Sequence, residues 1–326
     1  MGIGGYWLLE VESRSLPFEQ QLMKLLRAFV NNRPRLFWLL QMVKKVLRPR
    51  VWRNTCAVVR GRVLCAFWYT GDDNLNWGDK INPWFIESLS GKPVVHANDV
   101  FNLPGIRIFV CIGSVVGQIP NSGSTFYIWG PGMLQESSLL MDGKRKFLGV
   151  RGPKTHHALR RQGWDVDSIE GCYGDPALLL PRLYTPVGKG KEYRLGIIPH
   201  YLDKNNPCWT EFKGSGVLFI DVFERELEFI EQVCQCQNIV STSLHGLICA
   251  DAYGVPSAWI AVDDRSVDKD FKFVDYYSSL GYHGLTCLRL TSEFQIEDLI
   301  SRCTIKDVKG LQEQLWRSCP FRKEVD

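Results

Sequence analysis

The short segment Ser241–Gly246 combines three hydroxyl side chains, a histidine and a glycine in an order that suits anion binding. An apolar run ends where the segment begins and a helical pattern starts inside it, which predicts a strand-to-helix turn. Backbone N–H groups and the positive end of the helix dipole would attract a phosphate or carboxylate there. His245 could bond a phosphate oxygen or transfer a proton near neutral pH. The alternative interpretation is a capping serine beside a packed histidine.

Three further side chains could complete an anion site. Arg151 is a candidate bidentate clamp for a carboxylate or phosphate, or alternatively a surface arginine at a helix start. His200 stands between a proline and a tyrosine and is a second candidate ligand, although such a histidine also suits a core or a loop. Ser114 follows a glycine at the end of an apolar run and could contribute a hydroxyl.

An acidic loop, residues 71–79, has side chains that suit a sugar. Asp72, Asp73 and Asp79 could hold sugar hydroxyls, and Asp72 or Asp79 could act as a general base. Asp79 could equally cap the helix that follows it.

Several other chemistries lack their motifs in this sequence. No Gly-x-Gly-x-x-Gly follows a predicted strand, and no Gly-Lys pair is followed by Ser or Thr, so dinucleotide and P-loop chemistry are disfavoured. The eleven cysteines form no Cys-x-x-Cys pair and no His-Glu-x-x-His is present, so we expect free thiols in a reducing compartment, no metal and no cofactor. We expect no secretory signal, no spanning helix and no nucleic-acid partner.

The elements that must position these residues alternate between strands and helices. The 326 residues are 45% hydrophobic and 23% charged, a composition that excludes a disordered or fibrous chain. Apolar runs predict strands at 63–69, 93–96, 107–112, 125–129, 147–150, 195–199, 217–220, 238–241 and 258–262. Helical patterns cover 79–89, 153–162, 223–236, 244–253 and 312–318.

This alternation predicts an α/β fold made of two Rossmann-like domains that face a central cleft. We expect an N-terminal acceptor-side domain at 62–185, a C-terminal donor-side domain at 186–326 ending in a helix, and a helical extension at 1–61. The candidate site residues follow predicted strands, so they would gather at the carboxyl ends of the two sheets, where open sheets bind ligands.

The extension carries most of the positive charge. The segment 14–62 holds twelve Lys or Arg and one acid, Glu19, for a net +11, whereas the rest of the chain is at −7. Apolar residues recur at helical spacing before and after Pro34, with a second break at Pro49. Such basic amphipathic helices either bind an anionic membrane surface or pack on the body with their charges solvated.

Five short motifs together resemble the polysaccharide pyruvyl transferase family, in particular its succinoglycan-type exopolysaccharide branch. In chain order they are Asn76-Trp77-Gly78-Asp79, Val150-Arg151-Gly152-Pro153, Gly174-Asp175-Pro176-Ala177, Ile198-Pro199-His200-Tyr201 and Ser243-Leu244-His245-Gly246. The resemblance covers about residues 67–262 and leaves the basic segment outside.

The resemblance implies a fold like that of GT-B glycosyltransferases and a metal-independent ketal pyruvyltransferase. Phosphoenolpyruvate would be the donor and co-substrate. The acceptor would be a sugar diol in a bacterial surface polysaccharide or its lipid-linked precursor, modified in the cytoplasm or at the inner face of the plasma membrane.

On this reading His245 acts as an acid or phosphate ligand, with Asp79 or Asp72 as the base. The other residues divide between donor and acceptor. The donor contacts would be Arg151, His200, Ser243, Ser241, Ser114 and Gly246, and the acceptor contacts Asp73, Asn76 and Trp77.

One departure concerns the donor. Many family members carry an arginine where this chain has Ser243, so another group must supply that contact. Two alternatives remain open: a nucleotide-sugar glycosyltransferase on the same scaffold, and a non-catalytic polysaccharide-assembly protein.

Overall fold

The strands of the described residues form two five-stranded parallel sheets. The computed structural model describes residues 45–71, 76–187, 190–214, 216–262, 270–284, 286–291 and 293–322. The first sheet has the order β2-β1-β3-β4-β5, with β1 at Leu64–Ala66, β2 at Val94–His96, β3 at Arg107–Val110, β4 at Thr125–Trp129 and β5 at Arg145–Gly149. The second has the order β10-β9-β8-β6-β7, with β6 at Leu195–Ile198, β7 at Val217–Phe219, β8 at Ile239–Ser241, β9 at Ser257–Ala261 and β10 at Leu288–Arg289. The pairings are parallel throughout both sheets, which confirms the predicted α/β class.

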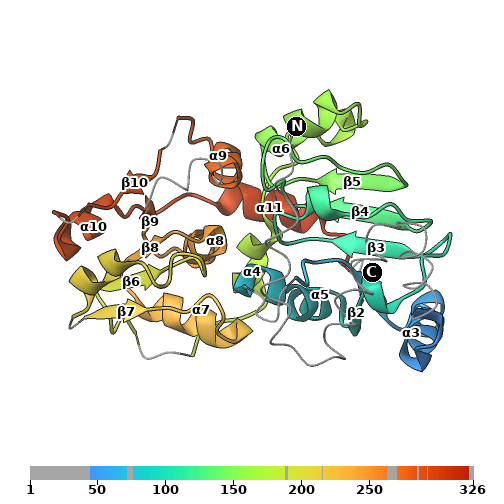
Figure 1. The fold of residues 1–326 in the computed structure, drawn as a ribbon, viewed down its shortest axis with the longest axis horizontal. Coiled ribbons are helices and arrows are strands. Elements are labelled where there is room, and N and C mark those ends of the chain that lie inside the picture. Colours follow the sequence, from blue (N-terminus) through green and yellow to red (C-terminus); the bar gives the residue numbers. More distant parts are fainter. Residues whose placement is uncertain are drawn as a thin grey trace, which may run out of the picture.

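Helices separate and cover the two sheets. Figure 1 shows α4 (Trp77–Lys80), α8 (Leu244–Ala252) and α9 (Asp270–Ser279) between them. Strands β6, β8 and β9 are buried along their whole length, as expected for parallel strands covered on both faces. Other predicted helices are confirmed with small shifts, as α6 at Pro153–Arg161, α7 at Glu226–Gln235 and α11 at Lys309–Ser318.

The predicted helix at 79–89 is two helices, α4 and α5 (Asn82–Ser90). Pro83 has no N–H and therefore cannot donate to the Asp79 carbonyl one turn earlier. The Asn82 side chain takes over this role, because its Nδ2 donates to the carbonyls of Gly78 (3.2 Å), Asp79 (3.1 Å) and Ile112 (3.1 Å). The same amide accepts from the Ile112 N–H at 3.1 Å, so the break in the helix is fixed to the end of β3.

Three α-helices and one strand are not predicted by the sequence patterns: α3 (Pro49–Val59), α9, α10 (Ile296–Arg302) and β10. The sequence of α9, Asp-Phe-Lys-Phe-Val-Asp-Tyr-Tyr-Ser-Ser, is rich in residues of modest helix propensity. Packing on both sides compensates, since Phe273 stacks on Trp259 with ring centroids 4.5 Å apart. Pro49, the predicted break in the helical pattern, begins α3, where its missing N–H costs no hydrogen bond.

One hydrophobic core extends across both sheets. Buried members come from the first sheet (Phe109, Trp129), from the second (Ile239, Trp259) and from the 3-10 segment Pro176–Arg182 between them. The three leucines of that segment are fully buried and lie against α8. Burial of apolar surface at about 25 cal/mol per Å² makes this shared core the main force that holds the two sheets together.

The C-terminal helix α11 returns to the first sheet after the second is complete (Figure 1). Trp129 Nε1 in β4 donates to Ser318 Oγ at 3.1 Å. Phe321 lies 4.7 Å from Phe109 and 6.0 Å from Trp129, measured between ring centroids. The last described residues thus cover apolar side chains of the first sheet.

The described end of the basic segment packs on the first sheet. In α3, Val51 is fully buried, and Arg50 forms an ion pair with Asp99 at 3.1 Å. Thr55 Oγ1 accepts from the Phe101 N–H at 3.0 Å. Helix α3 therefore packs on the body. The helix predicted before Pro34 and most of the one predicted after it lie outside the described residues, and membrane binding stays a prediction.

Two further sequence-based expectations can be compared with the structure. All eleven cysteines are free, as expected, and Cys65, Cys111 and Cys249 are buried. Within the described ranges, we find no helix that is both long and apolar enough for a bilayer crossing.

We expect Val51→Ala to lower the free energy of unfolding by about 2 kcal/mol more than Val59→Ala, because the first removes two methyl groups from a filled site. Val59 lies on the same helix and is 67% exposed, so it undergoes the same change in helix propensity without loss of packing. Urea unfolding of both variants measures the difference. Equal effects would contradict the docking of α3.

Candidate active site

A pocket of about 450 Å³ lies where the carboxyl ends of strands from both sheets meet. The first sheet and its helices provide one wall and the second sheet provides the other. The polar and aromatic lining residues are Tyr69, Asn76, Asp79, Ser114, Gln118, His200, Tyr201, Phe223, Ser243, His245 and Lys272. Six candidates from the sequence, Asn76, Asp79, Ser114, His200, Ser243 and His245, therefore come together at one place.

His245 is held at the start of α8 with its ring almost buried. It is 6% exposed, and a Cβ on Gly78 would lie only 2.0 Å from Nδ1, so glycine there leaves room for the imidazole. Nε2 lies 3.7 Å from Oδ2 of Asp175, which is fully buried. Asp175 Oδ1 accepts from the Ala177 N–H at 3.0 Å, which fixes the carboxylate. The histidine is thus packed beside a buried acid. The capping half of the alternative does not hold, because the Ser243 side chain makes no cap hydrogen bond to α8.

The turn before α8 uses most of its hydroxyls to hold itself. Ser241 Oγ accepts from the Ser243 N–H at 2.9 Å, and Thr242 Oγ1 accepts from the His200 N–H at 2.7 Å. A Cβ on Gly246 would lie 2.7 Å from Ser241 Oγ, so this glycine permits close packing. Of the residues predicted here as donor contacts, only Ser243 and His245 line the pocket; Ser241 and Gly246 shape the turn.

Asp79 is a buried carboxyl that faces two basic side chains. Burial raises its pKa from 3.8 to about 6, and the charges of His245 and Lys272 oppose this effect. The capping alternative is wrong for Asp79, because the helix cap is Asn76, whose side chain accepts from the Gly78 N–H at 3.2 Å. The Asp79 carboxyl, whose pKa of about 6 is close to neutrality, is therefore available to a ligand.

Arg151 lies beneath the pocket and not in its wall. Its side chain is fully buried, with Nε 3.3 Å from Asp275 Oδ2 and one terminal nitrogen donating to the Met133 carbonyl at 2.9 Å. The other terminal nitrogen donates to Ser114 Oγ at 2.7 Å. The geometry therefore does not show the predicted direct anion clamp. The guanidinium binds protein groups, and one of its nitrogens positions Ser114.

Trp77 and two of the loop aspartates are not part of the described pocket wall. Trp77 is 1% exposed, stacks on Phe229 at 4.5 Å and donates from Nε1 to the Glu226 carbonyl at 2.9 Å, so it belongs to the core and not to the pocket. Asp72 and Asp73 lie outside the described residues.

Sequence reasoning missed two charged groups at this site. Lys272, 9% exposed, enters the pocket wall from α9, which was not predicted as a helix. Asp175 belongs to the motif Gly174-Asp175-Pro176-Ala177, but the sequence patterns assign it no role. An acidic residue in this motif is the signal that could have identified it. The lining rings of Tyr201 and Phe223, 6.1 Å apart, were also missed.

Among the residues that the structure describes, no three His, Cys, Asp or Glu side chains gather in a way that could hold a metal ion.

Comparison with known proteins places the chain among polysaccharide enzymes. Residues 100–264 match the family model described as polysaccharide pyruvyl transferase. An uncharacterized protein, L143, of Acanthamoeba polyphaga mimivirus is 32% identical over 214 residues, or 64% of this chain and 72% of that protein. The succinoglycan biosynthesis protein ExoV of Rhizobium meliloti (strain 1021) is 28% identical over 227 residues, or 66% of this chain and 64% of that protein.

A solved structure was also found at low similarity. It is a functionally uncharacterized protein from Klebsiella pneumoniae with 9% identity and a TM-score of 0.35, covering 75% of this chain and 100% of that one.

We expect Asp79→Asn to stabilise the fold more at about pH 8 than at about pH 4, by about 2 kcal/mol. The raised pKa means that the folded state resists ionisation, so the wild type loses stability as pH rises from 3.8 to about 6. Asparagine does not ionise, so the variant does not lose stability over this pH range. Urea unfolding at both pH values measures it, with the exposed Asp165→Asn as control. A gain independent of pH would contradict the raised pKa.

Proposed function

Because the chain belongs to the polysaccharide pyruvyl transferase family, we propose that it transfers the pyruvyl group of phosphoenolpyruvate to a diol of a sugar in a surface polysaccharide or its lipid-linked precursor. The observation that carries the proposal is the pocket itself, in which Asp79, His245 and Lys272 lie together. An acid, a base and a cation are the groups that this transfer needs.

The reaction joins one donor to two hydroxyls. A proton adds to C3 of the enol, and one sugar hydroxyl attacks C2 and loses its proton. The second hydroxyl then takes the place of the phosphate at C2, which yields a cyclic pyruvate ketal and inorganic phosphate. The protein must therefore donate a proton, accept protons from hydroxyls and bind two anionic groups of the donor.

His245 is suited to the acid role or to bonding the phosphate. Its ring is held between Gly78 and the carboxylate of Asp175, so its orientation is defined before substrate arrives. An imidazole positioned by a second acid is a common arrangement for proton transfer. Asp175 does not line the pocket, and we assign it as a positioning residue.

Asp79 is suited to the base role. General acid–base catalysis works best when the pKa of the group lies near the working pH, and burial brings that of Asp79 to about 6. Asn76, beside it in the pocket wall, could orient the acceptor sugar. Asp72 and Asp73 keep their proposed roles as base and acceptor contact.

Lys272 supplies the cationic contact for which Arg151 was proposed. Arg151 is buried beneath Ser114, and the family's arginine is replaced by Ser243, yet a donor with a carboxylate and a phosphate needs positive charge. Lys272 lines the pocket together with Ser243 and His200. We assign these three residues and Ser114 to donor binding.

The proposal extends to the larger arrangement. We propose that the two sheets are the halves of a GT-B-like fold that meet near residue 186, and that the enzyme works without a metal. We further propose that it acts in the cytoplasm or on the inner face of the plasma membrane, with basic residues of 14–62 on anionic lipid. The net +11 of the basic segment supports the last point.

The direct test is incubation with phosphoenolpyruvate and a panel of lipid-linked saccharides, with phosphate release and the ketal methyl signal followed by NMR. Formation of a ketal supports the function. Thermal stabilisation by a nucleoside diphosphate but not by phosphoenolpyruvate would favour a glycosyltransferase instead. Donor binding without turnover on every glycan would favour an assembly protein.

We expect His245→Ala to lower kcat for phosphate release by at least about 100-fold, because a positioned proton donor contributes on this scale. Asp175→Asn, which leaves the ring in place but removes its charge partner, should cost less, about tenfold. Phosphate release that survives in His245→Ala would exclude the acid role. Thermal melting of both variants checks that they are folded.

We expect Lys272→Gln to raise the KM for phosphoenolpyruvate about tenfold or more while the KM for the saccharide changes little, because of the two substrates the donor is the one that carries negative charge to the lost ammonium. The exposed Lys213→Gln, which removes the same charge elsewhere, is the control. An equal rise in both KM values would assign Lys272 to general packing of α9 and not to the donor.

A further inference from the structure

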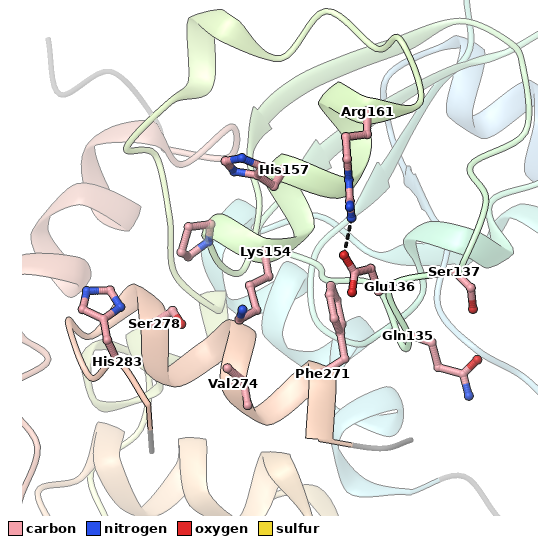
Figure 2. A pocket seen from close by; sticks show the side chains of 11 residues that line it. Gln135, Glu136, Ser137, Lys154, His157, Arg161, Phe271, Val274, Ser278 and His283 are labelled. Atoms are coloured by element: carbon pink, nitrogen blue, oxygen red, sulfur yellow. Dashed lines mark hydrogen bonds and ion pairs between the residues drawn. The ribbon is translucent and has the colours of Figure 1, made fainter. Parts of the chain in front are cut away.

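A second hollow, of about 970 Å³, lies between α6 and α9 on the outside of the molecule. Figure 2 shows Lys154 of α6 in its middle, with His283 on one side and the ion pair of Arg161 and Glu136 on the other. Phe271 and Val274 of α9 form its apolar wall. The proposed chemistry uses none of these side chains.

The same two segments border both hollows. Leu134 lines the pocket described above, and Gln135, Glu136 and Ser137, the next residues along the chain, line the second hollow. In α9, Lys272 lines the pocket, whereas Phe271, Val274 and Ser278 line the second hollow at spacings of three and four residues. A long ligand could therefore occupy the pocket and continue past residue 134 into this hollow.

The lining of the second hollow suits a carboxylated saccharide. Lys154 is exposed and forms no ion pair with an acid of the described residues. Glu136, the nearby acid, is bound to Arg161, and this hydrogen bond and the charges of Arg161 and Lys154 all lower its pKa. Two histidines, His157 and His283, add donors. Side chains of Gln135, Ser137 and Ser278 can bond hydroxyls, and the partly buried Phe271 and Val274 can cover the C–H faces of sugar rings.

We propose that this hollow binds an acidic stretch of the acceptor polysaccharide, in which neighbouring sugars carry carboxylates, while the reacting sugar occupies the pocket. The proposal rests on the proposed function, because it assumes that the acceptor is a glycan. The chain outside residues 14–62 has a net charge of −7, which disfavours a polyanion as dense as a nucleic acid. A concave site between two helices also suits a single polymer chain better than a flat lipid surface.

The test is direct binding of the full-length protein to an oligogalacturonate and to a neutral dextran of the same length, at low and at high salt. We expect salt-sensitive binding of the oligogalacturonate and weaker binding of the dextran. Lys154→Glu should weaken oligogalacturonate binding about tenfold or more, because it reverses the charge in the middle of the hollow. Glutamate near a helix start favours the helix, so this variant should fold, and Lys154→Gln should give a smaller loss.

Lys144→Glu is the matched control, since Lys144 is exposed and lies outside both hollows. Equal affinity of the Lys154→Glu variant and the wild type for oligogalacturonate would overturn the proposal. So would a loss confined to phosphatidylglycerol vesicles, which would assign the hollow to a membrane. Turnover gives a second readout, in which kcat/KM for a long acidic acceptor is divided by kcat/KM for a short one. Lys154→Glu should lower this ratio, while Lys144→Glu should leave it unchanged.

Binding is measured without the donor, so the two proposals can fail separately. If the wild type releases no phosphate with any acceptor, the proposed function fails while the binding results still decide for or against the hollow. If Lys154→Glu binds oligogalacturonate as the wild type does and has the same ratio of kcat/KM for long and short acceptors, the proposal for the second hollow fails while the proposed function stands.

Discussion

The buried carboxylate of Asp275 is the contact on which both hollows depend. It projects from α9 and accepts from the N–H of Thr155 at 2.9 Å and from the hydroxyl of the same residue at 2.7 Å, which fastens α9 to the first turn of α6. Its second oxygen also lies 3.3 Å from Nε of Arg151, and that arginine holds Ser114 in the pocket wall. One side chain thus sets the distance between α6 and α9 and the position of a pocket hydroxyl. Removing one partner of such a buried ion pair typically costs about 3–5 kcal/mol.

Glycines allow this contact to form. A Cβ at residue 152 would lie 2.0 Å from the carbonyl oxygen of Asp275, and one at residue 132 would lie 2.3 Å from the guanidinium of Arg151. The Arg-Gly-Pro motif therefore serves the packing of α9 against α6. The resemblance implies a donor contact at Arg151, whereas in the structure the motif supports the packing around the pocket.

The sequence was informative where local rules decide the outcome. Strands β4 and β8 were predicted almost to the residue, because β-branched and aromatic runs end at glycine or serine. The gathering of Asp79, His200 and His245 also followed from the carboxyl-end rule for parallel sheets. Burial could not be predicted in this way. Arg151 and Trp77 are of types common in binding sites, and only the packing of α7 and α9 shows that they are enclosed. Lys272 was missed because its helix is stabilised by tertiary contacts and not by its own pattern.

The return of the chain to the first sheet has a consequence for synthesis on the ribosome. Phe321, which packs on Phe109 and Trp129, is translated long after every strand of the first sheet has left the exit tunnel. Until then the apolar side chains of β3 and β4 that it covers remain open to water or to a chaperone. The first half therefore cannot complete its folding during translation, because part of its apolar cover is made last. The long sequence separation of these contacts also predicts slow folding, with the two halves becoming stable together.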